Sequence, residues 1–121
     1  MRVFLSVAAV LAWIFGGALL LVPAEFYRPT GIALTPMLAT LAQAHGATLV
    51  GLGVVNWLAR GAERQGLIAV LAGNLAVQVL SLCVVAWTMS LGAGSAVAPG
   101  LVIHIVLGSL FAYFLLKVVR S

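Results

Sequence analysis

The chain has 121 residues, of which 64% are hydrophobic and only 7% are charged. These are too few polar side chains to cover a soluble globule of this size, so the composition places the protein in a lipid bilayer. Six basic residues against two acids give a formal net charge of +4, but they are too few and too scattered to follow a phosphate backbone, which argues against nucleic acid as a partner. The single cysteine, Cys83, excludes an internal disulfide and a thiolate metal cage.

Four segments are long and apolar enough to cross a membrane. Crossing a hydrocarbon core of ~30 Å takes about 20 helical residues. The predicted spans are residues 3–22, 36–58, 66–90 and 97–118. Charged residues, proline or glycine stand at their boundaries, where a helix leaves the lipid. We therefore predict an all-α fold, an integral membrane four-helix bundle that forms a single transmembrane domain over residues 1–121.

The first span also has features of a cleavable signal sequence. Arg2 precedes an apolar run, and the small residues Val22 and Ala24 stand before Glu25. The apolar core of a signal peptide is roughly 7 to 15 residues long, whereas this run has about 20. Its length favours a retained span, and a mature chain that begins at Glu25 is the alternative.

The basic residues predict the orientation of the spans. In a four-span topology only Arg28 lies on one side, and the others all lie on the opposite side: Arg2, Arg60, Arg64, Lys117 and Arg120. Loops rich in Lys and Arg stay on the cytoplasmic side. We therefore expect both termini in the cytoplasm of a bacterial cell, the inner membrane as the location, and outward-facing links at residues 23–35 and 91–96.

A polar stripe runs along the third predicted span. Asn74, Gln78 and Ser81 are spaced i, i+4 and i+7, so they share one face of an otherwise apolar helix. One interpretation is hydrogen bonding to a neighbouring helix, worth about 0.6–2 kcal/mol per contact. The other is the wall of a polar cavity for a headgroup, a quinone or a small transported solute. Asn56, near the cytoplasmic end of the second span, either extends that wall or caps its helix.

Both histidines lie within predicted spans. His45 follows Pro36 by about 13 Å of helix and His104 follows Val97 by about 10 Å, so the two imidazoles share one depth on spans that both run from outside to inside. Two imidazoles on two helices are an arrangement that ligates haem b. The alternative is a neutral imidazole that hydrogen-bonds a Gln, Ser, Thr or backbone carbonyl of the next helix, or that responds to pH.

Groups for catalysis are not apparent in the sequence. It contains no nucleophile with an adjacent base, no paired carboxylates and no phosphate-binding glycine loop. Its only acids, Glu25 and Glu63, fall in predicted links. We therefore expect a protein that is not an enzyme, with no cofactor, and with no metal site other than haem iron in the haem alternative.

Two stretches carry a resemblance to a known family. The first helix contains "IFGGALLLVP" and ends at a proline, a loop follows, and the second helix finishes in "GLGVVNWLAR". In hydropathy and loop placement the whole chain resembles small bacterial four-helix membrane proteins of the DoxX-like kind. The resemblance implies an inner-membrane protein, sometimes accessory to a respiratory or oxidoreductase complex, and it carries over no binding residue.

The function expected from the sequence is that of a non-catalytic accessory subunit or a small-ligand-binding bundle. Its expected partners are the lipid bilayer and other membrane subunits or further copies of the chain, because small residues let helices approach closely within lipid. The first alternative is a haem b or quinone-binding membrane anchor of an oxidoreductase that uses His45 and His104. The second is a small-solute transporter with a path along the polar stripe.

Overall fold

The computed structural model describes residues 1–92 and 97–121, which form helices and links and include no strand. It contains four helices that are long and apolar enough to cross a membrane, as the sequence predicts. The helices form two compact units, Met1–Gly61 and Ala62–Ser121, and each is described by itself. Residues 93–96, in the predicted outer link 91–96, lie outside the described residues.

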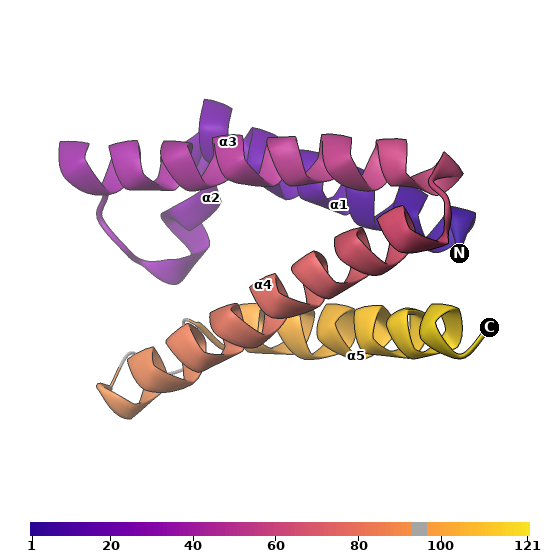
Figure 1. Ribbon diagram of the computed structural model, residues 1–121. Coiled ribbons are helices and arrows are strands. Elements are labelled where there is room, and N and C mark those ends of the chain that lie inside the picture. Colours follow the sequence, from indigo (N-terminus) through magenta and orange to yellow (C-terminus); the bar gives the residue numbers. More distant parts are fainter. Residues whose placement is uncertain (93–96) are drawn as a thin grey trace. The chain divides into compact units, whose positions relative to one another are not determined.

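The N-terminal unit is built on α1 (Arg2–Leu21) and α3 (Pro36–Leu58), which pack side by side along their length (Figure 1). The predicted link between them contains a short helix, α2 (Pro23–Tyr27), and a 3-10 turn, Arg28–Thr30. Pro23 suits the first position of α2 because that residue needs no backbone N–H donor. This local structure brings the link back over α3.

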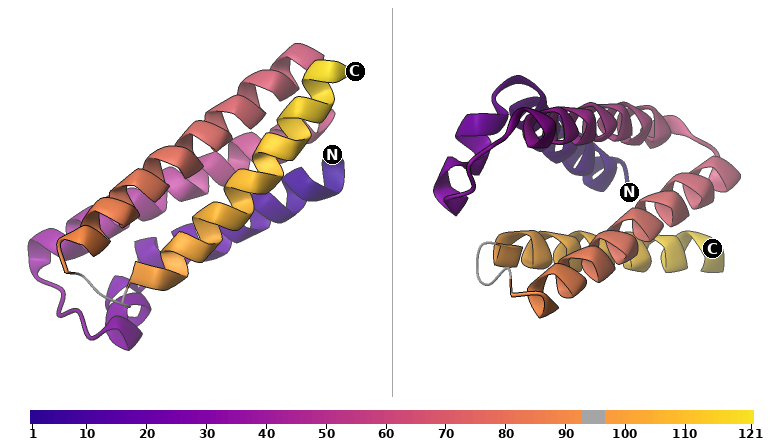
Figure 2. Two further views of the ribbon diagram at one scale, coloured as in Figure 1. Left: turned by 90° about the horizontal axis from the view of Figure 1, so that it is seen from below. Right: turned by 90° about the vertical axis from the view of Figure 1, so that its left-hand side faces the viewer.

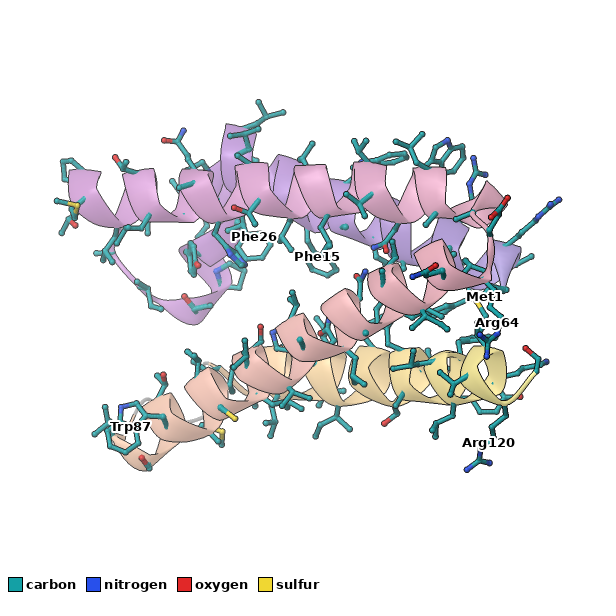
Figure 3. The ribbon with its side chains drawn as sticks, in the orientation of Figure 1. Met1, Phe15, Phe26, Arg64, Trp87 and Arg120 are labelled. Carbon is teal, nitrogen blue, oxygen red and sulfur yellow. The ribbon has the colours of Figure 1, made fainter. Side chains whose placement is uncertain are left out.

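Two contacts fix the ends of this link. The Phe26 ring of α2 meets the Phe15 ring of α1 edge-on, with centroids 6.3 Å apart (Figure 3). At the other end the Thr35 hydroxyl accepts a hydrogen bond from the backbone N–H of Leu38 at 3.2 Å, which caps α3. Gly31, between them, has φ of 72°, a left-handed conformation that favours glycine.

Glycines set the distance between α1 and α3. A Cβ placed on Gly46 would lie 2.6 Å from the carbonyl oxygen of Gly16, and one on Gly53 would lie 2.5 Å from the indole of Trp13. Two backbones in such contact gain dispersion energy along the whole crossing, which is what holds helices together in lipid. Trp13 is therefore a packing residue between α1 and α3.

The C-terminal unit is a pair of long helices, α4 (Arg64–Ser90) and α5 (Ala98–Arg120), shown from two sides in Figure 2. The buried residues of each helix share one face and face the other helix: Leu71, Asn74 and Gln78 on α4, and Gly108, Phe111 and Val118 on α5. The core of this unit is thus part polar, because two of the three buried residues of α4 carry amides.

The observed helix bounds lie within two residues of the predicted spans. The largest differences are at Arg64, where α4 begins before the predicted residue 66, and at Arg120, where α5 ends after the predicted residue 118. A helix continues through charged residues such as Arg64 and Arg120 once it reaches the headgroups, whereas hydropathy marks mainly the apolar part of a span.

Candidate functional site

A hydrogen bond between two side chains joins His104 of α5 to Gln78 of α4. The imidazole Nδ1 lies 2.7 Å from the side-chain Oε1 of Gln78. Oε1 accepts hydrogen bonds and does not donate them, so Nδ1 carries the proton and the contact selects one imidazole tautomer. Gln78 is buried and His104 is half-buried. A pair that is largely shielded from water is stronger than the same pair on a surface.

Gly108 lies at the contact between α5 and Gln78. It is one turn after His104, and a Cβ at Gly108 would lie 3.4 Å from the Cβ of Gln78, an ordinary van der Waals contact. The backbone of α5 therefore approaches the start of the glutamine side chain, while the imidazole one turn earlier meets its end.

The other members of the predicted polar stripe have different surroundings. Asn74 is buried and its amide donates to the carbonyl of Val70 in its own helix at 2.9 Å. Ser81 is half-buried on the same side of α4. Asn56 is buried, but on α3 of the N-terminal unit. The structure thus brings Gln78 and His104 together, which is the hydrogen-bonded interpretation of that histidine.

His45 occupies a different environment. It is exposed on α3 and lines an open pocket of about 240 Å³ with Tyr27, Leu34, Leu38 and Leu41. His45 belongs to the N-terminal unit and His104 to the C-terminal unit. Ligation of one haem by both histidines therefore stays a prediction.

Arg60 makes three side-chain contacts near the end of α3. Its guanidinium lies 3.3 Å from the ring centroid of Trp57, a cation–π contact, and Nε donates to the Trp57 carbonyl at 2.7 Å. Nη1 donates to the Ser6 hydroxyl at 3.3 Å, which joins the end of α3 to the start of α1. The three-residue spacing of Trp57 and Arg60 places both on one side of the helix end and could have predicted their contact, but sequence reasoning did not use it.

Arg64 has a matching role in the C-terminal unit. Its guanidinium donates to the carbonyls of Val118 and Val119 at 3.2 and 2.9 Å (Figure 3). The last carbonyls of a helix have no partner within it, and a cation is favoured beside them by the helix dipole. This contact joins the first residue of α4 to the end of α5, a long-range pairing that sequence reasoning missed.

In the link between α1 and α3, Arg28 forms an ion pair with Glu25, and the Thr30 hydroxyl donates to the carbonyl of Tyr27 at 2.7 Å. Both ion-pair partners are exposed, so the pair adds little stability. The pair does offset the charge of Arg28, which belongs to the same link as the pocket residues Tyr27 and Leu34.

Comparison with protein-family models, with curated proteins and with solved structures gives no match. The described residues by themselves define the class, which is helical and has among those residues four helices that are long and apolar enough to cross a membrane.

Proposed function

We propose that the chain is a non-catalytic integral protein of the bacterial inner membrane that acts as an accessory subunit, held against other membrane helices or against a second copy of itself. The observation that carries the proposal is the Gln78–His104 hydrogen bond. This hydrogen bond uses two polar side chains that are chemically able to bind a ligand, and it uses them to hold α4 against α5. A hydrogen bond between two helices gives the pair a fixed shape, and an accessory subunit needs a fixed shape to hold its partner.

The outer faces of the helices support assembly. Both units expose large apolar side chains along their length; examples are Leu21 and Leu58 in the N-terminal unit, and Leu80 and Val102 in the C-terminal unit. Gly51 and Gly73 lie on open faces where a Cβ would meet nothing within 4 Å. Small residues beside apolar ones let another helix approach closely in lipid. These faces are suited to lipid and to partner helices alike.

Native mass spectrometry of the full chain, released from mild detergent, tests this proposal. We expect a defined complex, either with other membrane subunits from the native host or as a homo-oligomer. A bare monomer at every protein concentration would contradict it. A retained mass of haem b would instead favour the alternative of a haem anchor that uses His45 and His104.

The proposed orientation, with both termini in the cytoplasm, rests on the positive-inside distribution of charge. In a Cys83→Ser background, a single cysteine introduced as Thr30→Cys should react with a membrane-impermeant maleimide on intact cells. Glu63→Cys and Ser121→Cys should react only after the cells are permeabilised. Their reaction after permeabilisation also serves as the control that these cysteines are reactive. Labelling of Ser121→Cys on intact cells would place the C-terminus outside and overturn the topology.

A further inference from the structure

The pocket beside His45 lies where the outer link folds over the beginning of α3. Leu38, Leu41 and His45 are spaced i, i+3 and i+7, so they line one face of that helix. Tyr27 and Leu34 of the link form the opposite wall. His45 lies about 13 Å along the helix from Pro36, which places the pocket in the outer half of a ~30 Å hydrocarbon core.

Two of the residues that line this apolar pocket, Tyr27 and His45, carry polar groups. Neither the imidazole of His45 nor the hydroxyl of Tyr27 makes a hydrogen bond to another residue in the described part of the chain. A polar group within lipid is costly unless it is hydrogen-bonded. The two side chains therefore favour an occupant that brings oxygen atoms into a space otherwise lined by leucines. His104, by contrast, has Gln78.

Size and charge narrow the class of occupant. A cavity of roughly 150 Å³ holds a benzene ring, so the volume of about 240 Å³ has room for one ring with substituents. No lysine or arginine is among its lining residues, and Arg28 close by in sequence is paired with Glu25. The pocket therefore disfavours phosphate and other anions and accepts an uncharged headgroup.

We propose that this pocket binds an uncharged, membrane-soluble amphiphile with a single-ring, oxygen-bearing headgroup. The ring lies among Leu34, Leu38 and Leu41, and its oxygens hydrogen-bond the imidazole of His45 and the hydroxyl of Tyr27. Its apolar tail leaves through the open side of the pocket into the lipid. A quinone and an alkylphenol share this chemistry. The proposal depends on the membrane location but not on assembly with a partner.

The two histidines of the chain allow a direct test. Protein labelled with ¹⁵N only in histidine, and placed in nanodiscs of uncharged lipid, gives imidazole signals from His45 and His104, which a His45→Ala variant assigns. Titration with a decyl-substituted benzoquinone or with 4-decylphenol should shift the His45 signals saturably and leave those of His104 unchanged. Decyl phosphate should produce no saturable shift. The two neutral probes distinguish a quinone from a phenol as the preferred source.

Variants of the pocket sharpen the test. Tyr27→Phe removes one hydrogen bond and should weaken binding about two- to tenfold, whereas Leu41→Trp fills the pocket and should abolish the shift. Thr48→Val is the matched control, since it removes a hydroxyl from the exposed surface of the same helix outside the pocket lining, and it should bind as the parent protein does. Unchanged His104 signals verify that the C-terminal unit of each variant is folded, and an unchanged unfolding transition in mixed micelles with SDS verifies the N-terminal unit.

Three results would overturn the proposal: no saturable shift of His45 with either neutral probe, equal shifts of both histidines, or affinity that Tyr27→Phe and Leu41→Trp leave unaltered. Tight binding of decyl phosphate would likewise contradict an uncharged site. Since nanodiscs hold the isolated chain, a failure here is separate from a failure to form a complex in the mass spectra.

Discussion

Replacing Gly46 by alanine should destabilise the N-terminal unit by about 1–3 kcal/mol, the usual cost of forcing an added methyl group into a packed interface. The new Cβ would lie 2.6 Å from the carbonyl oxygen of Gly16 and 2.7 Å from the backbone nitrogen of Leu20. Both obstacles are backbone atoms of α1, so no side-chain rotation relieves the clash and the helices must separate. Reversible unfolding in mixed micelles with increasing SDS measures the loss.

Gly51→Ala is the matched control on the same helix. A Cβ at Gly51 meets nothing within 4 Å, so this variant should be as stable as the parent or gain up to about 1 kcal/mol from the better helix propensity of alanine. Equal stability of the Gly46 and Gly51 variants would mean that α1 and α3 do not pack through Gly16 and Gly46.

The helices could be predicted because a membrane-spanning segment is defined by local composition. Residues 36–58 were predicted as a span, and α3 is Pro36–Leu58. Within lipid, length and hydropathy nearly determine the element, since backbone groups must be hydrogen-bonded within the helix. The short helix α2 (Pro23–Tyr27) could not be read in the same way, because it depends on Phe26 packing against Phe15 of another element.

The candidate site could be predicted only in part from the sequence. The spacing of Asn74 and Gln78 predicted a shared face, and both are buried. A glutamine was one of the predicted types of partner for a histidine. Choosing Gln78 for His104 requires the register of α4 against α5, which no single helix determines. Long-range registers of this kind are not encoded in any one segment.

The two histidines illustrate the same limit. Sequence depth alone made His45 and His104 equivalent, yet His104 is bonded to Gln78, whereas His45 lies exposed in a pocket with Tyr27. The difference comes from what stands opposite each one. The side chain of Gln78 on α4 meets His104, whereas a link that contains Pro23 and Gly31 lies beside His45. Span prediction treats such a link as a mere connection.

Gln78→Leu and His104→Leu should each destabilise the C-terminal unit by about 1–3 kcal/mol, because each leaves the other polar group shielded from water without its hydrogen bond. The double variant should lose less than the sum of the two, since it replaces both groups with apolar ones. The difference is the coupling energy, for which about 0.6–1.7 kcal/mol is expected between helices in lipid. SDS unfolding of the four proteins measures it.

Ser81→Ala is the control for the cycle, since Ser81 belongs to the same polar stripe but is only half-buried. Combined with His104→Leu it should show no coupling. Additive losses for Gln78→Leu and His104→Leu would mean that the 2.7 Å contact does not hold α4 against α5, and they would remove the observation on which the accessory role depends. A positive coupling energy confined to Gln78 and His104 would instead show that His104 stabilises the packing of α4 against α5. His45 would then be the histidine available to a ligand.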